Sequence, residues 1–457
     1  MTACFPQESL SSERDVRDLV EEAANAAKND LDEQSALKWA GGYEFPASFV
    51  DSDMAMLKAA ALDFPKMVER RFKILAPDRL SAERVSRLRV DNPERDLMFD
   101  LAIGMKVIKP VCFVANGTAP RSPLRSNYVN VAPAVNKMLS ELVKQKLALD
   151  AALRHIPDLH FCKAHWCTKK GKASGRPLGD MSNVGGTKLN TPETVDEATA
   201  YYGQICHPTI EDIAKMVHDF WSEAKERNPL LRWEDLRIWK MDLKGAYTLL
   251  SFRPKDVGLF SMLLTGDIVY LQIVGIFGWS GTPAAFQVVT RAMLWELRHA
   301  LQSRTLMYVD DVIGVCFAAD LEADLVKARH VCTDILGSGA VADDKTEEGT
   351  RLDIIGYTMC LETERVLISR KNFLTALHRF VSTDVGGRIN LRQAQRLASL
   401  GTRYAKICRV MRPFCTALHR ATRGRTDGFA LFNQPEEAVT AKSHVSFGIE
   451  KPTIRDL

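Results

Sequence analysis

Between residues 236 and 369, apolar residues form short continuous runs typical of strands and longer segments with a helical period. Short apolar runs bounded by polar residues or glycine are typical of strands, and apolar residues three and four apart are typical of helices. The elements predicted in chain order are a strand over 236–243, a helix over 284–301, strands over 305–309 and 312–317, a helix over 321–336, and a hairpin over 352–361 and 365–369. This alternation predicts an α+β arrangement, in which two helices pack on one face of an antiparallel sheet.

The same patterns extend the prediction on both sides of this region. The further predicted elements are acidic helices within 1–100, helices over 128–153 and 209–225, a hairpin over 258–264 and 268–275, and basic helices over 370–425. The polar stretches 191–197 and 343–346 are predicted as loops. Thr282 is predicted as a helix N-cap, with Pro283 at the first helical position.

Three aspartates lie near the ends of the predicted strands. Asp310 and Asp311 are the only residues between two apolar runs, which predicts a hairpin with both carboxylates at its tip. Like charges at a tight turn repel each other unless a cation lies against them, and Mg²⁺ is held by one or two carboxylates together with substrate phosphates. Asp is also a common turn residue, so an acidic turn without function is the alternative. A sheet that brings Asp242 beside the pair would form a two-metal site.

Length and composition narrow the class of protein. The chain has 457 residues, of which 46% are hydrophobic and 26% charged, as in globular proteins of about two to four domains. Its ten cysteines are scattered without a paired framework, which predicts a reducing, intracellular compartment, either cytoplasm or nucleus. The N-terminus has no apolar leader, and the apolar region 257–278 is interrupted by Thr265-Gly266-Asp267. Neither a signal peptide nor a membrane span is therefore predicted.

The net charge of +4 is distributed unevenly. Residues 1–100 hold 20 acidic and 14 basic side chains, whereas residues 365–425 hold 14 basic side chains and a single acid, Asp384. A segment this basic predicts contact with a phosphate backbone. A solvated helical surface is the alternative, although such a surface normally mixes in acids.

A second basic stretch, residues 169–176, places four cations around two glycines. This composition suits a hairpin that grips phosphate, with Arg176 able to bind in a bidentate manner, and a solvated basic loop is the alternative. Cys162, His165 and Cys167 precede it and could be read as zinc ligands. Their spacing matches no common zinc finger and no second pair follows, so zinc is disfavoured.

Several stretches also match, in order, the motifs of one family. Tyr308-Val309-Asp310-Asp311 resembles a Tyr-x-Asp-Asp box, and residues 242–247 resemble a catalytic box, Asp-x-x-x-Ala-Tyr/Phe. Residues 277–287 resemble a Phe-Gly-Leu-x-x-Ala-Pro-x-x-Phe-Gln box. Lys345 with residues 352–357 resembles a lysine motif and a Phe-Leu-Gly primer grip, and residues 170–183 resemble a fingers segment. From about Tyr128 to Arg425 the chain thus resembles the reverse transcriptases of retroelements of the long-terminal-repeat, tyrosine-recombinase and pararetroviral types.

The resemblance implies a role for each matched residue. Asp242, Asp310 and Asp311 would hold two Mg²⁺ ions, with Mn²⁺ as an alternative, and Lys345 would give a proton to pyrophosphate. The residues implied to bind the deoxynucleoside triphosphate are Lys170, Lys172, Arg176, Tyr247 and Gln287, with Tyr247 as the aromatic gate against a ribose 2′-OH. The residues implied to bind primer and template are Gly356, Tyr357, Arg392, Arg396, Arg403 and Lys406.

Plainer readings of three of these residues stay open. Tyr247 could be a core aromatic residue. Lys345 could be a solvated loop lysine paired with neighbouring acids. Gln287 could be a residue of a helix surface.

The resemblance also implies a right-hand polymerase architecture with a palm of antiparallel strands and packed helices. The implied parts are a mainly helical acidic N-terminal region of unknown role over 1–120, fingers over 121–236, a palm over 237–369 with 258–300 partly facing the fingers, a basic helical thumb over 370–425, and a loosely structured tail over 426–457. The tail is too short for a ribonuclease H domain.

The function implied is template-directed DNA synthesis on an RNA or DNA template, as the polymerase segment of a retrotransposon. The implied partners are a template–primer and deoxynucleoside triphosphates, without a membrane. Two other readings stay open: a non-catalytic nucleic-acid-binding remnant of a retroelement, and an RNA-dependent RNA polymerase.

The chain departs from the family pattern at several positions. Ile276 stands where the family usually has Pro, and Trp279 where it has Leu. Ile354-Ile355 replaces Phe-Leu, and Asp180-Met181-Ser182-Asn183 is a loose version of the end of the fingers motif. The long gap before Asp242 predicts an insertion around 184–210. None of these departures removes a predicted metal ligand.

Overall fold

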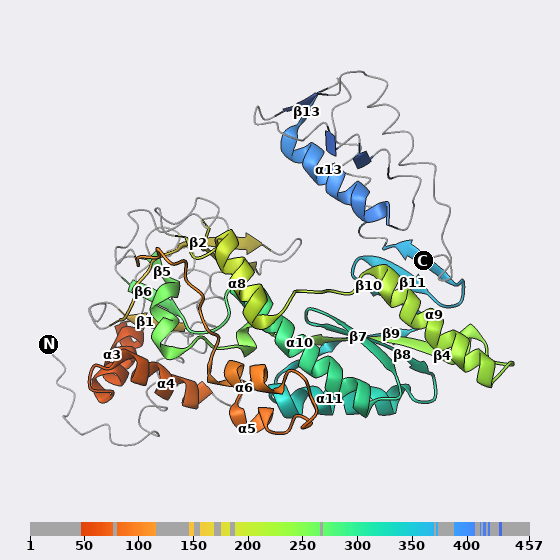
Figure 1. Ribbon diagram of the computed structural model, residues 1–457, viewed down its shortest axis with the longest axis horizontal. Coiled ribbons are helices and arrows are strands. Elements are labelled where there is room, and N and C mark those ends of the chain that lie inside the picture. The colour runs from red at the N-terminus through yellow and green to blue at the C-terminus, as the bar shows by residue number, and fades with distance from the viewer. Residues whose placement is uncertain are drawn as a thin grey trace. The chain divides into compact units, whose positions relative to one another are not determined.

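The computed structural model describes two compact units of the chain (Figure 1). The first unit comprises residues 1–206, 243–296 and 329–341, and the second comprises residues 207–242, 297–328 and 342–457. The residues described within them are 47–75, 80–115, 146–149, 156–168, 175–182, 188–265, 268–369 and 388–406, with short pieces at 372, 412, 415–416, 419–420 and 429–431. None of the helices in these ranges is long and apolar enough to cross a bilayer.

A four-stranded sheet forms the centre of the second unit. Its strand order is β7-β8-β4-β9, with β7 at Arg304–Tyr308, β8 at Asp311–Phe317, β4 at Leu236–Leu243 and β9 at Val341–Gly349. Strand β8 runs antiparallel to both β4 and β7. The predicted antiparallel sheet in an α+β chain is therefore confirmed. Strand β4 has the predicted bounds because its apolar run ends at charged or glycine-containing segments on both sides.

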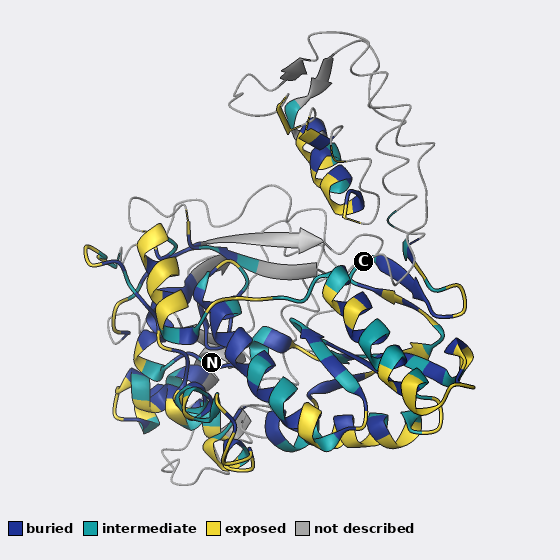
Figure 2. Ribbon diagram, turned by 45° about the vertical axis from the view of Figure 1, so that its right-hand side comes forward, coloured by how far each residue is buried: buried dark blue, intermediate teal, exposed yellow. Residues whose placement is uncertain are grey.

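Helix α9, Ile210–Arg227, covers one face of this sheet. Thr209 caps it: its hydroxyl accepts from the Asp212 amide at 3.3 Å, and the Asp212 carboxylate accepts from the Thr209 amide at 2.7 Å. The buried side of α9 forms one core with alternate residues of β4 and β8 (Figure 2). The same core includes a three-stranded sheet of β10 (Arg351–Ile354), β11 (Tyr357–Cys360) and β12 (Arg365–Ile368).

The opposite face of the sheet is organised by Trp239, whose side chain is fully buried. Its cross-strand partner is Gly314, and its indole Nε1 donates to the Ser303 hydroxyl at 3.1 Å. The Ser303 amide in turn donates to Asp324 at 2.7 Å, in the first turn of α11, Leu321–Leu336. A buried carboxylate is costly unless it accepts hydrogen bonds, and Asp324 accepts from the amides of both Gln302 and Ser303. This network fastens the start of α11 to the sheet.

Gly314→Ala is expected to destabilise the second unit. A Cβ at this position would lie 2.2 Å from the Trp239 indole, and overpacking of a dense core typically costs about 1–3 kcal/mol. Urea denaturation would show this loss in the free energy of unfolding. Adding Trp239→Phe should recover part of the loss, because the smaller ring leaves room for the methyl group. An unchanged unfolding midpoint in Gly314→Ala would contradict the described packing.

The first unit is built on a second antiparallel sheet with strand order β1-β6-β5. Its strands are β1 at Lys146–Leu149, β6 at Ile268–Gln272 and β5 at Ser261–Thr265. A separate hairpin pairs β2, Lys163–Thr168, with β3, Gly175–Asp180. Helix α8, Pro192–Tyr202, and most of α10, Gly281–Ala300, complete this part.

The N-terminal segment is an integral part of the first unit. Its helices are α3 (Ala47–Ala59), α4 (Phe64–Leu75), α5 (Ala82–Val85) and α6 (Arg95–Ile103). Just after α6, Met105 forms a parallel bridge with Phe252. On α10, Arg291 forms an ion pair with Glu94 at 2.6 Å, and the buried Glu296 accepts from the Asn92 amide group at 2.8 Å. These contacts tie the segment to the core, a placement that its acidic composition alone did not predict.

Four predicted elements outside the candidate site are wrong, each because of local signals or pairings. Within the predicted basic helices, residues 388–390 form the strand β13, which pairs with β14, Phe429–Leu431. Residues 146–149 lie in a predicted helix but pair with β6 as a strand. Residues 191–197 were predicted as a loop, but Thr191 caps α8 and Pro192 occupies its first turn, both of which are helix-start signals. The predicted loop at 343–346 belongs to β9, whose polar residues suit a strand at the edge of a sheet.

Candidate active site

The second unit brings two of the predicted catalytic carboxylates together. Asp242 near the end of β4 and Asp311 at the start of β8 are direct Cα partners in the antiparallel ladder. Paired Cα atoms in such a ladder lie about 4.5–5.5 Å apart, and side chains of paired residues share a face. The register also places them on the face of Ile238 and Ile313, which carry the core beneath α9. Burial of that neighbouring core fixes the register, because a slip of one residue would turn both aspartates to the opposite face.

The hairpin that carries Asp310 is shifted by one residue from its predicted position. Strand β7 ends at Tyr308 and β8 begins at Asp311, and these two residues are paired. The turn therefore consists of Val309 and Asp310 rather than of the two aspartates. Asp310 lies in the turn next to Asp311, whose position in the ladder is set by its neighbours on β4 and β7.

Val309 adopts a backbone φ of +55° at this turn. A positive φ is rare for a β-branched residue and costs on the order of 1–3 kcal/mol. Tight two-residue hairpins require a positive φ in the turn, a position usually taken by Gly or Asn. Such strain persists only where the surroundings hold it, and it concentrates at functional sites.

The negative charges of the aspartates are only partly balanced. Burial raises the pKa of Asp311 from 3.8 to about 6, and the neighbouring carboxylates of Asp310 and Asp242 add to the rise in pKa. The ammonium groups of Lys240 and Lys345 act in the opposite direction. An aspartate held ionised here at neutral pH is a group that a cation would stabilise.

Lys345 lies on β9, with its Nζ 2.7 Å from Asp242 Oδ1. The sequence placed this lysine in a loop among Asp343, Asp344 and Glu347, as a candidate to pair with them. Because β9 is the neighbour of β4 in the sheet, the ammonium reaches across to Asp242, whose side chain is only 15% exposed. The structure thus connects the predicted lysine motif to the predicted carboxylate site.

Among the residues that the structure describes, no three His, Cys, Asp or Glu side chains form a ready-made metal site, and this includes the three aspartates. The ammonium of Lys345 occupies one oxygen of Asp242. However, Mg²⁺ in phosphoryl-transfer sites needs only one or two carboxylates, since water and substrate phosphates supply its other ligands. The hard oxygen donors of Asp242 and Asp311 fit such an ion once Lys345 releases Asp242.

Asp311→Asn is expected to stabilise the metal-free protein at pH 7.5. A carboxyl with a raised pKa contributes its stability below pH 3.8 and loses that contribution as the pH rises through about 6. The variant should therefore gain on the order of 1 kcal/mol at pH 7.5, after solvent screening is allowed for, and less at pH 5. Denaturant unfolding at the two pH values measures the difference.

Denaturant unfolding repeated with about 10 mM Mg²⁺ tests whether the site binds the ion. A ligand that binds only the folded protein raises its free energy of unfolding. Mg²⁺ should stabilise the wild type at pH 7.5 and leave Asp311→Asn unchanged. The exposed Asp344→Asn on β9 serves as the charge-matched control. An equal gain for Asp311→Asn at both pH values would contradict the electrostatic account.

The predicted nucleotide-binding residues lie in the first unit. Tyr247 follows Gly245, whose φ is +73°, in a short 3₁₀ helix, η5, Ala246–Leu249. Its half-buried ring packs against Phe277 at a centroid distance of 4.8 Å and against Phe286 at 5.7 Å. Arg176 lies on β3, opposite Cys167 in the ladder. Lys170 and Lys172 lie outside the described residues, as do the details of the Arg176 side chain.

Gln287 is buried on α10 rather than exposed on a helix surface. Its Nε2 donates to the Cys206 carbonyl at 3.4 Å, and its Oε1 has no hydrogen-bond partner among the described atoms. The helix itself begins at Gly281, so the prediction of Thr282 as its N-cap is wrong. Thr282 lies inside the first turn with a buried hydroxyl. Gln287 remains a predicted nucleotide contact.

The predicted primer-binding turn separates β10 from β11, so residues 352–361 are two strands rather than one. Ile355 and Gly356 have φ values of +43° and +91°. The Gly356 carbonyl accepts from the Asn372 side-chain amide at 2.9 Å, and the Tyr357 hydroxyl donates to the Arg403 carbonyl at 2.8 Å. The strained turn is thereby fastened to the end of α13, Leu391–Tyr404.

The basic residues predicted to follow the template lie on or just after α13. Arg396, Arg403 and Lys406 are exposed, and Arg392 is in the first turn of the helix. Their exposure leaves them accessible to a phosphate backbone, and their role stays a prediction. Most of the remaining basic segment lies outside the described residues.

His207 is a neighbour of the candidate site that the sequence did not reveal. Its ring lies 5.2 Å from that of Tyr308, the residue that closes the hairpin with Asp311. Burial lowers the pKa of His207, so it packs as a neutral ring. It precedes α9 in the chain and far precedes Tyr308, and no spacing signal connects the two.

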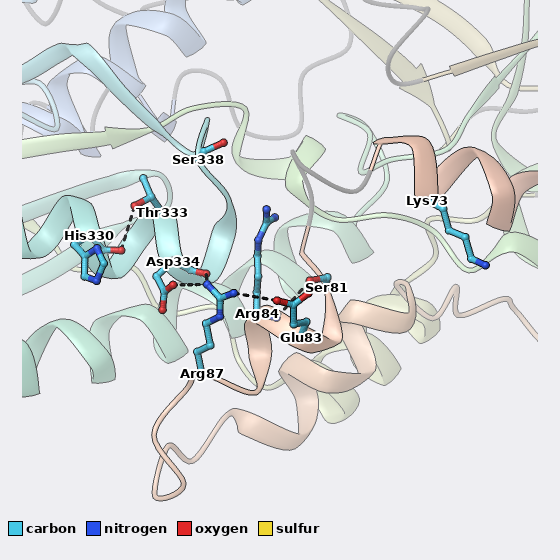
Figure 3. A pocket seen from close by; sticks show the side chains of 9 residues that line it. All are labelled: Lys73, Ser81, Glu83, Arg84, Arg87, His330, Thr333, Asp334 and Ser338. Atoms are coloured by element: carbon cyan, nitrogen blue, oxygen red, sulfur yellow. Dashed lines mark hydrogen bonds and ion pairs between the residues drawn. The ribbon is translucent and has the colours of Figure 1, made fainter. Parts of the chain in front are cut away.

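Two other features do not carry the predicted chemistry. A cavity of about 640 Å³ in the first unit lies between α4, α5 and the end of α11 (Figure 3). There the guanidinium of Arg87 is already engaged, because it forms ion pairs with both Glu83 and Asp334. The buried Cys162 thiol donates to the Ser261 carbonyl, and burial raises its pKa to about 12, which opposes the thiolate that zinc requires.

No protein-family model and no curated protein matches the chain. Solved structures that are similar to it include the foamy viral protease-reverse transcriptase dRH in complex with double-stranded DNA, with a TM-score of 0.49 and 11% identity over 80% of this chain and 59% of that chain. The foamy viral protease-reverse transcriptase in complex with an RNA/DNA hybrid has a TM-score of 0.47 and 11% identity, over 80% of this chain and 45% of that chain. The same protein in complex with double-stranded DNA has a TM-score of 0.47 and 11% identity, over 80% and 70%.

The chain thus spans about half of the length of the first two of these structures.

Proposed function

We propose that the chain performs template-directed DNA synthesis on an RNA or DNA template by two-metal nucleotidyl transfer, as the polymerase segment of a retrotransposon. The observation that supports this most is the direct pairing of Asp242 with Asp311 in the antiparallel ladder, with Asp310 in the adjoining turn. Asp242 and Asp311 are 69 residues apart in the sequence, and only this register places them side by side, where they could bind the same metal ions. An acidic surface turn without function would not require a second, partly buried carboxylate such as Asp242 opposite it on the neighbouring strand.

In this proposal the carboxylates of Asp242, Asp310 and Asp311 hold two Mg²⁺ ions. The chemistry that these ions would supply is a lower pKa of the attacking primer hydroxyl and neutralisation of the triphosphate. The chain itself contributes the fixed positions of the carboxylates, because β4 and β8 are rigid central strands of the sheet. The strained Val309 turn holds Asp310 beside Asp311 without a flexible linker.

Lys345 has two roles in the proposal. Without substrate, its ammonium neutralises Asp242 and keeps that carboxylate from facing Asp311 unbalanced. With substrate, the ammonium turns to the triphosphate and gives a proton to the leaving pyrophosphate, as general acids do. Its side chain is about half exposed, which leaves it free to change partner.

The partners proposed are a template–primer, held through the basic residues of α13, and deoxynucleoside triphosphates, held near Tyr247, Gln287 and Arg176. Contacts to the backbone phosphates would make template binding weaken steeply with salt. Sequence-independent contact of this kind suits an enzyme that must move along its template.

Primer extension on an RNA template with Mg²⁺ tests the proposal. The wild type should extend the primer with deoxynucleotides and should prefer them over ribonucleotides. Template binding without extension would support the non-catalytic remnant, and equal use of ribonucleotides would support an RNA polymerase. Either result would overturn the proposed function.

A further inference from the structure

A side-chain amide in the first unit clamps the loop that leads into α10. Asn190 Nδ2 donates to the Gly278 carbonyl at 2.6 Å, while its Oδ1 accepts from the Ser280 amide at 2.9 Å and from the Ser280 hydroxyl at 3.0 Å. One amide thus satisfies a backbone acceptor and a backbone donor two residues apart. In this respect it imitates the edge of a neighbouring strand.

Asn190 is itself held firmly in place. The amides of Leu189 and Asn190 both donate to the carbonyl of Met181, the residue after β3, at 3.1 Å. Leu189 is fully buried, and its carbonyl accepts from the Thr194 hydroxyl in the first turn of α8 at 2.8 Å. The clamp is therefore anchored on one side by β3 and on the other by the capped start of α8.

The clamped loop lies directly on β3. The Gly179 amide donates to the Phe277 carbonyl at 2.9 Å, and Leu178 forms a parallel bridge with Phe277. Gly278 has a φ of +106°, and a Cβ there would lie 1.9 Å from the Gly179 carbonyl oxygen. Such a close approach requires that the loop stay in one position.

Phe277 connects this loop to Tyr247. The two rings lie 4.8 Å apart at an interplanar angle of 46°, and the Tyr247 carbonyl approaches Gly275 so closely that a Cβ there would lie 2.3 Å from it. The residue after the clamp's first contact, Trp279, is buried against Phe252 and Phe260. Phe277, against which the Tyr247 ring packs, therefore belongs to the loop that Asn190 holds.

We propose that Asn190 is a positioning residue for sugar selection: it fixes the 277–280 loop, and through Phe277 it fixes the ring of Tyr247. This inference rests on the proposed function, in which Tyr247 excludes the 2′-hydroxyl. The side chain of Asn190 bonds only Ser182, Gly278 and Ser280 among the described residues, none of which is proposed to contact the nucleotide. Its loss would let the Tyr247 ring move away, so that ribonucleotides are admitted and deoxynucleotides are held less well.

The test compares Asn190→Ala with Asn190→Asp and with Ser182→Ala. Alanine removes every clamp bond, and aspartate keeps the acceptor for Ser280 but loses the donor to Gly278. Ser182→Ala is the matched control, because it removes only the 3.1 Å bond from Asn190 Nδ2 to the Ser182 hydroxyl. Thermal unfolding of each variant shows whether the fold is retained.

The first readout is amide hydrogen exchange at Ser280, which reports the clamp without any activity. Exchange should become about tenfold faster in Asn190→Ala, because the acceptor of the Ser280 amide is lost; this change corresponds to about 1.4 kcal/mol. In Asn190→Asp and Ser182→Ala the acceptor remains, so exchange should stay near the wild-type rate. Unchanged exchange in Asn190→Ala would overturn the clamp.

The second readout is steady-state incorporation of deoxynucleotides and ribonucleotides. In Asn190→Ala the KM for deoxynucleotides should rise about tenfold with a small change in kcat, and the preference over ribonucleotides should fall about tenfold. Wild-type preference in a variant whose Ser280 exchange is faster would overturn the positioning role. If the wild type itself extends no primer, the proposed function fails and takes the sugar-selection role with it, while the exchange data still decide whether the clamp exists.

Discussion

The double variant Asp310→Asn with Asp311→Asn is expected to extend no primer at a measurable rate. Two of the three proposed metal-holding carboxylates lose their charge, whereas the size of each side chain is unchanged. Metal ions supply several kcal/mol of charge stabilisation in such reactions, and each 1.4 kcal/mol is a tenfold change in rate. The expected loss in kcat is therefore about 10³-fold or more, measured by single-turnover primer extension.

The matched control is Asp344→Asn with Glu348→Gln. Both residues are exposed on β9, so the control removes two negative charges from the same sheet. It should keep wild-type extension. Template–primer affinity of the active-site variant should be retained or raised, since two negative charges are lost near the nucleic acid. Extension by the active-site variant at the wild-type rate would rule out catalysis by these aspartates.

Tyr247→Ala is expected to lose discrimination between deoxynucleotides and ribonucleotides. In the proposed function the ring blocks the 2′-hydroxyl, and exclusion of a small group by a side chain is worth roughly 1–3 kcal/mol. The ratio of the two kcat/KM values should therefore fall by about 10- to 100-fold. The ring rests on Phe277 and Phe286, which line the space that alanine would leave open.

Tyr247→Phe keeps the ring and provides the control for this variant. It should retain discrimination, because the phenolic hydroxyl is not needed to block the sugar. If Tyr247→Ala keeps the wild-type ratio, then Tyr247 is a core aromatic residue. If the phenylalanine variant also loses discrimination, the hydroxyl rather than the bulk of the ring is responsible.

Much of the second unit followed from local sequence patterns. Strand 236–243 and helix 321–336 were predicted at their observed bounds. Each has a strong periodicity of its own and is bounded by turn residues, so its limits do not depend on partners. Thr209 and Asp212, three residues apart, likewise form a capping box, which is a local signal for the start of α9.

Two of the errors occurred where a distant partner overrode the local pattern. The polar stretch around Lys345 reads as a loop but is a strand, because β4 offers it a free edge. The hairpin tip moved by one residue because pairing of Tyr308 with Asp311 left Val309 in the turn, against the preference of a β-branched residue. Sequence patterns report only local preferences, whereas the register of the sheet is set by the burial of Ile313 and Val315 in the core.

The sequence by itself placed three aspartates, an aromatic residue and two basic segments in an order that resembles the motifs of reverse transcriptases. Motifs of this kind are local, so they can be read from the sequence without knowledge of the fold. Only the tertiary structure decided that Asp242 faces Asp311, that Lys345 binds Asp242, and that Asn190 clamps the loop behind Phe277. The two members of each pair are separated by between 69 and 103 residues of sequence. No local preference encodes which distant group a side chain will meet, because bringing such residues together requires closure of a long loop of chain.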